Sequence, residues 1–252
     1  MEITLVEISI LVLTGLVAGV INTLAGGGSN LTLPALMIMG MPADIANATN
    51  RVGVLLQCII GIFGFHKHKK VETNDLGPIL WPTLTGGLVG AMFASYAPEV
   101  LLKPMLLSVM VTMTLIILIR PSIIIPSPET VPKKVGESSH SWWLLLVAGF
   151  YGGFVQAGVG FILLAALAGS LRYDLVRANA LKLVCSLGFT AVALTIFVIN
   201  DQVRWLPGLI LAIGTMSGAH IAVKFAITAK PNTLKWFLFV MTLCGSIAAM
   251  IF

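Results

Sequence analysis

Charged residues are scarce in this sequence, and their scarcity excludes an ordinary soluble domain. Only 10% of the 252 residues are Asp, Glu, Lys or Arg, and 58% are hydrophobic. Soluble domains average about 25% charged and 45 to 50% hydrophobic residues. Apolar runs cover nearly the whole chain. We therefore expect an all-α, multi-pass membrane protein that contacts the lipid bilayer and no nucleic acid.

Several chemical signatures are also missing. The sequence has no Walker loop, no dinucleotide fingerprint and no zinc-ligand spacing, so we expect no cofactor and no metal. Cys58, Cys185 and Cys244 lie in apolar runs and are expected to pack as free thiols. His220 is expected to be packed and neutral, with a proton relay as the alternative. An intramembrane enzyme would need a nucleophile such as Ser29, but "GGGSN" does not fit the G-x-S-x-G elbow, so we expect no enzyme.

The apolar runs predict eight membrane spans and two shorter segments. The shorter segments, 31–40 and 161–170, rise about 15 Å as helices, half of the roughly 30 Å hydrocarbon core. A polar linker at 121–141, rich in Pro and Ser, separates a first transmembrane repeat at 1–120 from a second at 142–252. The eight spans are expected at 5–24, 46–65, 76–95, 101–120, 142–157, 177–199, 205–226 and 233–252.

The two halves carry matching short motifs in the same order, which indicates an internal duplication of the kind found in transporters. The motifs "GGLVG" and "GTMSG" place glycines four apart, a spacing that lets membrane helices approach closely, either within one chain or between two copies. A homodimer therefore stays open. The matched motifs are "GLVAG" at 15–19 with "GFYGG" at 149–153, "AGGG" at 25–28 with "AGVG" at 157–160, "NATN" at 47–50 with "NALK" at 179–182, and "GGLVG" at 86–90 with "GTMSG" at 214–218.

The distribution of Lys and Arg favours halves of opposite orientation. When each short segment and its glycine loop count as one crossing, Arg51, Lys103, Lys182 and Arg204 lie on or nearest one face of the membrane. The other eleven of the fifteen basic residues then share the opposite face, as expected of a cytoplasmic face. Five crossings per half is an odd number, so on this count the second repeat is inverted relative to the first; the alternative count, four crossings per half, divides the basic residues seven to eight. We expect a plasma membrane (bacterial inner membrane) location with both termini outside the cytoplasm.

Two glycine-rich stretches interrupt the apolar pattern where a membrane helix would otherwise continue. Each glycine costs a helix roughly 1 kcal/mol relative to alanine, so three in a row unwind it. Unwound backbone in a membrane is tolerated only where it is buried in protein or lines a watered cavity. Each stretch precedes a short helix, whose N-terminus offers N–H groups to an anion. The two stretches are therefore a candidate central site, with simple tight helix crossing as the alternative.

Polar residues beside these stretches extend the candidate site. Asn22 and Gln156 carry amide donors that suit an oxyanion. Lys182 lies in an apolar run and is expected to face a cavity or a carboxylate, with snorkelling beside Arg177 as the alternative; the same alternative holds for Arg51. Apart from Glu7 near a segment end, no Asp or Glu lies in a predicted span, so the buried charge is positive. This balance favours an anionic substrate.

Several motifs carry a resemblance to a known family: the early glycine loop with Pro34, "ANATN", the midpoint linker, and "GFVQAGVGFILLAAL" with "RANALKL". Together they resemble the sulfite exporter family of TauE/SafE type, the TSUP transporters. The resemblance covers essentially the whole chain. It implies a transporter that exports small sulfur-containing anions, sulfite or organosulfonates. The substrate-binding residues implied by position, with Arg51 added because it adjoins Asn50, are Asn22, Gly26, Gly27, Gly28, Ser29, Asn50, Arg51, Gln156, Gly158, Gly160, Asn179 and Lys182.

This sequence departs from the more symmetric members of that family at two places. "AGVG" replaces a fuller glycine run in the second half, and Lys182 stands opposite Asn50. A membrane potential that is negative inside favours anion export by about 2.3 kcal/mol per charge per 100 mV. The alternatives are a transporter or channel for another small anion, and a membrane scaffold subunit that transports nothing.

Overall fold

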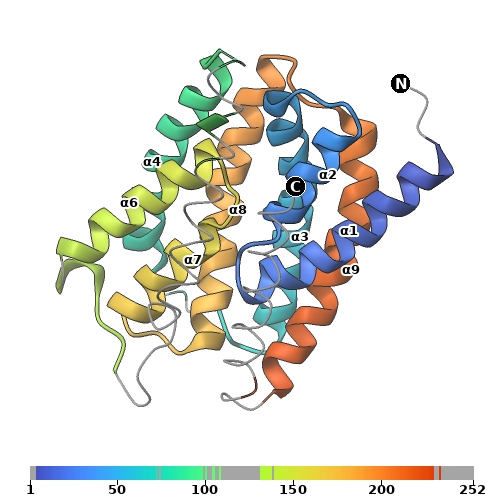
Figure 1. The fold of residues 1–252 in the computed structure, drawn as a ribbon. Helices are drawn as coiled ribbons and strands as arrows, with labels where there is room; N and C mark the ends of the chain where they lie inside the picture. Colours follow the sequence, from blue (N-terminus) through green and yellow to red (C-terminus); the bar gives the residue numbers. More distant parts are fainter. Residues whose placement is uncertain are drawn as a thin grey trace.

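The computed structural model describes residues 4–98 apart from 72 and 74, residues 131–229 apart from 138, and the single residues 100, 104, 105, 108 and 233. Every regular element within these residues is a helix (Figure 1). Five of them are long and apolar enough to cross a membrane: α1 (Leu5–Leu24), α3 (Ala43–Lys67), α4 (Leu76–Tyr96), α8 (Leu175–Ile199) and α9 (Trp205–Thr228).

The remaining helices are shorter. The 16-residue α6 (Ser139–Phe154) follows a 3-10 turn at Val135–Glu137. The two predicted half-helices are present as α2 (Ser29–Ile38) and as α7 (Val159–Leu164), which continues into a π-helical turn at Ala165–Ser170. The helix boundaries lie within three residues of those predicted. The predicted spans at 101–120 and 233–252 and most of the linker lie outside the described residues.

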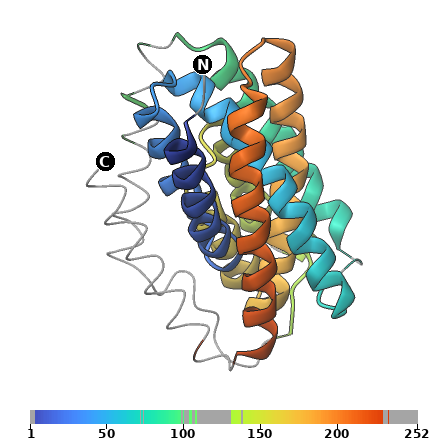
Figure 2. The same ribbon diagram turned by 90° about the vertical axis from the view of Figure 1, so that its right-hand side faces the viewer.

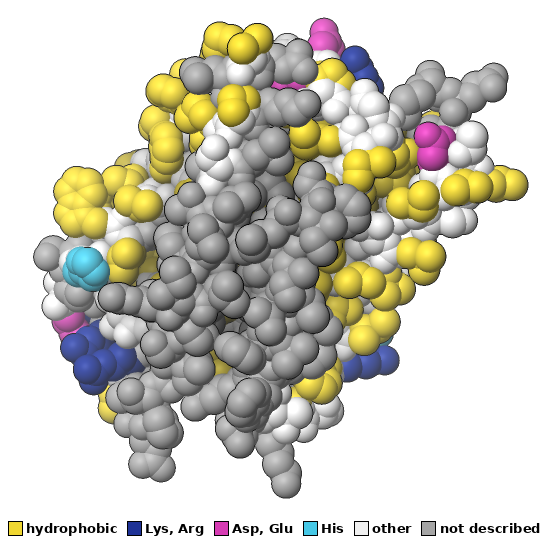
Figure 3. Space-filling model, in the orientation of Figure 1, with side chains coloured by type: hydrophobic (Ala, Val, Ile, Leu, Met, Phe, Trp, Pro, Cys, Tyr) yellow, Lys and Arg dark blue, Asp and Glu magenta, His cyan; other side chains and the backbone are white. Residues whose placement is uncertain are grey.

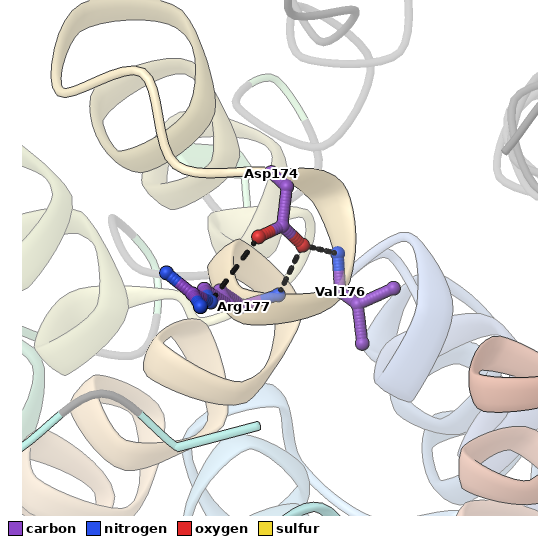
Figure 4. A network of polar contacts seen from close by, with 3 residues as sticks. All are labelled: Asp174, Val176 and Arg177. Carbon is purple, nitrogen blue, oxygen red and sulfur yellow. Dashed lines mark hydrogen bonds and ion pairs between the residues drawn. The ribbon is translucent and has the colours of Figure 1, made fainter. Parts of the chain in front are cut away.

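Capping side chains fix where individual helices begin. The side chain of Asp174 accepts hydrogen bonds of 3.0 Å from the backbone N–H groups of Val176 and Arg177, and Arg177 Nε lies 3.4 Å from the same carboxylate (Figure 4). This N-cap satisfies amides that have no partner within the helix. The cap starts α8 at Leu175, so that Asn179 and Lys182 follow within its first two turns.

Small residues let helices from the two halves touch. Gly15 and Gly19 of α1 lie against the backbone of α9, where Gly214 and Gly218 face back onto α1 (Figure 2). The second pair, α4 and α6, meets in the same way through the glycines at 86, 90, 149 and 153. A Cβ at any of these positions would overlap the neighbouring backbone. The small-residue motifs therefore pack within one chain, and each pairs a helix of one half with a helix of the other.

The same contacts give the relative directions of the helices. Gly15 lies near Leu211 and Gly19 near Thr215, so α1 and α9 run parallel; Thr83 and Gly87 face Gly149 and Gly153, so α4 and α6 also run parallel.

Contacts of α3 and α8 complete the set of directions. Position 52 of α3 lies near position 208 of α9, and position 64 lies near position 223, so α3 and α9 run parallel. Ser95 at the end of α4 forms a hydrogen bond with Gln202 just after α8, so α4 and α8 run in the same direction. In contrast, Gly61 of α3 contacts Leu183 of α8, whereas Arg51 of α3 lies over the ring of Phe197. Thus α3 and α8 are antiparallel, and α1, α3 and α9 run opposite to α4, α6 and α8 (Figure 1).

These directions sort the charged ends of the helices onto two faces. Only Arg204 of the described basic residues marks the face at the start of α9, while Arg51 and Lys182 are buried between the faces. Hydrophobic side chains dominate the visible flanks between the two ends in Figure 3. The opposite face gathers Lys67, Lys69, Lys70, Lys133, Lys134, Arg172, Arg177 and Lys224.

Candidate functional site

Two interruptions of the helical backbone lie at the predicted glycine stretches. Gly26 follows α1 with φ of +97°, and Gly158 follows α6 with φ of +77°. Backbone in this left-handed region favours glycine because a Cβ would approach the carbonyl oxygen. The aligned "AGGG" and "AGVG" motifs thus unwind the two halves at matching residues. Gln156 also has a positive φ, of +66°, which the sequence did not indicate.

The two breaks touch each other. Gly160 donates its backbone N–H to the carbonyl oxygen of Gly26 at 3.2 Å, and a Cβ on either glycine would overlap the other residue. A Cβ on Gly27 would meet the ring of Phe161. The two glycine stretches are therefore in direct backbone contact.

Lys182 is buried beside the end of α1, with 1% of its surface exposed. Its ammonium group donates to the carbonyl oxygens of Asn22 and Thr23, both at 2.9 Å, and to Asn179 Oδ1 at 2.7 Å. The alternative of snorkelling to the membrane surface is therefore wrong. Backbone carbonyls and an amide, rather than a carboxylate, satisfy its three donors in the described part of the chain.

Arg51 is fully buried beside the end of α6. Its guanidinium donates from Nη1 to the carbonyl oxygen of Gly152 and from Nη2 to that of Gly153 at 2.8 Å, with Phe154 O farther away at 3.4 Å. It also lies 5.5 Å from the ring centroid of Phe197. Burial excludes snorkelling here too. Nε of Arg51 is buried without a hydrogen-bond partner.

Arg51 is thus the spatial counterpart of Lys182, although the motifs align Lys182 with Asn50. Each cation lies on the helix that follows a half-helix and binds the carbonyl end of the broken helix of the other half. Asn47 and Asn179, which do align, sit beside the two cations: Asn47 Nδ2 donates to Phe154 O at 2.9 Å, and Asn179 Oδ1 accepts from Lys182.

Asn50 instead ties α3 to the first half-helix. Its Oδ1 accepts from Thr32 Oγ1 at 2.6 Å, and its Nδ2 donates to Ser29 Oγ at 3.0 Å. Both hydroxyls belong to α2, whose N-terminus at Gly28 has no side-chain cap. The structure therefore brings the predicted residues Ser29 and Asn50 together. Asn22, half-buried in the last turn of α1, contributes its carbonyl oxygen to Lys182.

Gln156 occupies the second break. Its Nε2 donates to Thr190 Oγ1 at 3.0 Å, while its Oε1 is buried without a partner. Tyr151 donates its hydroxyl to the carbonyl oxygen of Ala157 and thereby braces the loop from the preceding turn. In the first break Gln57 Nε2 reaches Thr23 Oγ1 at 3.3 Å.

The charge at this junction is positive and has no acidic counterpart among the described residues. Neither Arg51 nor Lys182 has an ion-pair partner there; the ion pair found joins Arg177 to Asp174 at the surface. Unpaired buried polar atoms also belong to Asn30, Gln156 and Asn179, at or near the breaks. No cluster of metal-ligating side chains occurs within the described ranges. Buried positive charge of this kind favours an anion over a cation.

Other predicted features have mixed outcomes. Cys58 and Cys185 are free and buried, as expected, whereas Cys244 lies outside the described residues. The prediction of a packed His220 is wrong, since this side chain is exposed on α9.

Sequence reasoning did not include several polar residues that complete the junction. Asn47 carried a signal, because it aligns with Asn179 in the repeated motif. The others are small or neutral side chains inside apolar runs and carried none; they are Thr23, Thr32, Gln57, Tyr151 and Thr190.

Comparison with known proteins gives consistent matches along the chain. The family model described as sulfite exporter TauE/SafE matches residues 11–249. A "Probable membrane transporter protein" of Haemophilus influenzae is 26% identical over 245 residues, covering 96% of this chain and 94% of that protein. The "Probable membrane transporter protein YfcA" of Escherichia coli K12 is 24% identical, covering 90% and 84%. "Probable membrane transporter protein ORF9" of Sinorhizobium sp is 22% identical, covering 95% and 91%. No solved structure matches the chain.

Proposed function

The chain belongs to the sulfite exporter TauE/SafE family of membrane transporters, and from that premise we propose that it exports small sulfur-containing anions, sulfite or organosulfonates. The observation that carries this proposal is the pair of buried cations at the helix breaks. Arg51 and Lys182 are each at most 1% exposed and have no carboxylate partner among the described residues. A cation at the centre of a membrane helix costs about 3 kcal/mol on insertion scales. Such a cost is expected where the positive charge serves an anionic substrate.

The proposed binding site is the junction of the two breaks. Residues 26–28 and 156–158 supply unwound backbone, and α2 supplies an N-terminus without a side-chain cap, which Asn50 holds in place through Ser29. Helix N-termini and amide side chains suit oxyanions because both present N–H donors. The same chemistry also fits other small oxyanions, which makes them the second candidate substrates.

We further propose that the halves are inverted repeats and that the basic face is cytoplasmic. The opposite directions of α1 and α6, of α3 and α8, and of α4 and α9 support inversion. Eight described basic residues at one end against Arg204 at the other support the orientation. The protein then lies in a bacterial inner membrane with both termini outside the cytoplasm. Reporter tags in the 66–75 loop and the 96–104 loop should report opposite sides of the membrane, and the same side from both would refute this topology.

The proposed export follows the membrane potential. An interior-negative potential drives a monoanion outward with about 2.3 kcal/mol per 100 mV, so a uniporter needs no coupling ion. Among the described residues, no carboxylate forms an ion pair with Arg51 or Lys182.

Proteoliposomes loaded with labelled sulfite under a set potassium-diffusion potential test this function directly. Saturable efflux that rises when the interior is made negative, and that short alkanesulfonates inhibit, is the expected result. Inhibition by phosphate or nitrate but not by sulfonates would indicate another small anion. Absence of flux and of binding for all these anions in folded protein would refute the transport proposal and favour a scaffold.

A further inference from the structure

We infer that Lys182 and Arg51 are positioning residues, each holding open the helix break that belongs to the other half of the chain. This inference rests on the proposed function and assigns the two cations distinct tasks in it. The geometry is reciprocal. Lys182 of the second half binds the carbonyl end of α1, and Arg51 of the first half binds the carbonyl end of α6.

The carbonyl end of a broken membrane helix needs such a partner. The last carbonyls of a helix lack intrahelical donors and carry partial negative charge, and lipid offers no water to satisfy them. At the first break these are the oxygens of Asn22 and Thr23; at the second they include those of Gly153 and Phe154. Without the cation, the end of the helix must find new donors or change conformation.

The two cations differ in what they leave for a substrate. An ammonium group has three donors, and all three of Lys182 are used by Asn22, Thr23 and Asn179. Lys182 therefore acts on transport through the position of the break and has no donor left to contact the anion. Arg51 has its Nε buried and unpartnered, so it retains a donor that can contact the anion in addition to holding α6. We expect the two breaks to be structurally equivalent and chemically unequal.

Reciprocity also couples the halves. A displacement of α8 relative to α1 pulls on the first break, and a displacement of α3 relative to α6 pulls on the second. Loss of either cation should therefore loosen the break in the half that does not contain the substitution.

Hydrogen exchange of the purified protein without substrate tests the reciprocal pattern. Lys182→Met should raise the exchange rates of amides 25–28 at least tenfold and leave those of 155–158 within twofold. Arg51→Met should show the reverse. If a methionine variant fails to fold, Lys182→Arg and Arg51→Lys should give the same pattern with smaller changes. Arg204→Gln, which removes an exposed cation, is the matched control and should change neither break. Equal loosening of both breaks, loosening in the substituted half, or no change would overturn the inference.

Transport kinetics separate positioning from direct binding. Lys182→Met should lower the Vmax of sulfite efflux at least tenfold with KM changed less than threefold, and Lys182→Arg should restore at least a third of Vmax. A tenfold higher KM with unchanged Vmax would instead make Lys182 a direct ligand. Should the wild-type protein move none of the tested anions, the proposed function fails, and the exchange pattern alone still decides the positioning role.

Discussion

Alanine substitutions at three glycines test whether the two helix breaks are packed against each other. Gly40 has φ of +85° and open space around it, so Gly40→Ala adds only left-handed strain, about 1 to 2 kcal/mol. Gly160 is helical, and its new Cβ would overlap Gly26, so Gly160→Ala adds overpacking of about 1 to 3 kcal/mol. Gly26→Ala adds both, about 2 to 5 kcal/mol in total.

Thermal unfolding midpoints in one detergent provide the assay. At about 2 to 4 °C per kcal/mol for a chain of this size, Gly40→Ala should lose about 2 to 8 °C and Gly26→Ala about 4 to 20 °C. Gly160→Ala should lose about 2 to 12 °C. Gly40→Ala is the matched control because it shares the backbone strain of Gly26→Ala without its contact. If Gly26→Ala is as stable as Gly40→Ala, or Gly160→Ala melts like the wild type, the breaks are not in contact and the central junction is refuted.

Three further outcomes follow from the contacts at the junction. Tyr151→Phe removes only the hydroxyl that donates to Ala157 O, so it should lower the free energy of unfolding by about 1 kcal/mol. Amide hydrogen exchange should become faster at the second break alone, and faster exchange at the first break would contradict this. Asn50→Leu leaves the hydroxyls of Ser29 and Thr32 without their partner and should cost about 1 to 3 kcal/mol; an unchanged melting midpoint would show that these bonds do not stabilise α2. For a monoanion uniporter, the equilibrium distribution of sulfite should change tenfold for roughly every 60 mV, and a distribution that ignores potential would refute uniport.

Local patterns in the sequence are sufficient to predict the helices of this protein. The described membrane helices and both half-helices begin and end close to their predicted limits because apolar run length and glycine content act locally. Left-handed φ at Gly26 and Gly158 is an observation of the structure that the glycine content permits, since glycine adopts that region without strain. The left-handed Gln156 was not predictable, because non-glycine residues seldom adopt this region; its backbone N–H donates to Tyr151 O, and its side-chain Nε2 donates to Thr190 Oγ1, 34 residues away.

Which groups a buried cation binds depends on the tertiary structure. The sequence indicated that Lys182 needs a polar partner, but the partner is a pair of carbonyls 159 and 160 residues away in the chain. It also aligned Lys182 with Asn50, whereas the structure makes Arg51 the counterpart. One residue along a helix turns a side chain by about 100°, so Asn50 faces α2 while Arg51 faces α6.

What the sequence by itself determined is therefore the membrane-embedded helical class, the two glycine breaks and the excess of buried positive charge. Each of these depends on the composition of a short stretch. Only the tertiary structure decided that the glycine motifs pack between the halves, that the breaks touch at Gly26 and Gly160, and that each cation serves the opposite half. The reason is physical: burying a charge or an unwound carbonyl in a membrane requires a partner, and which partner is within reach depends on how distant helices pack.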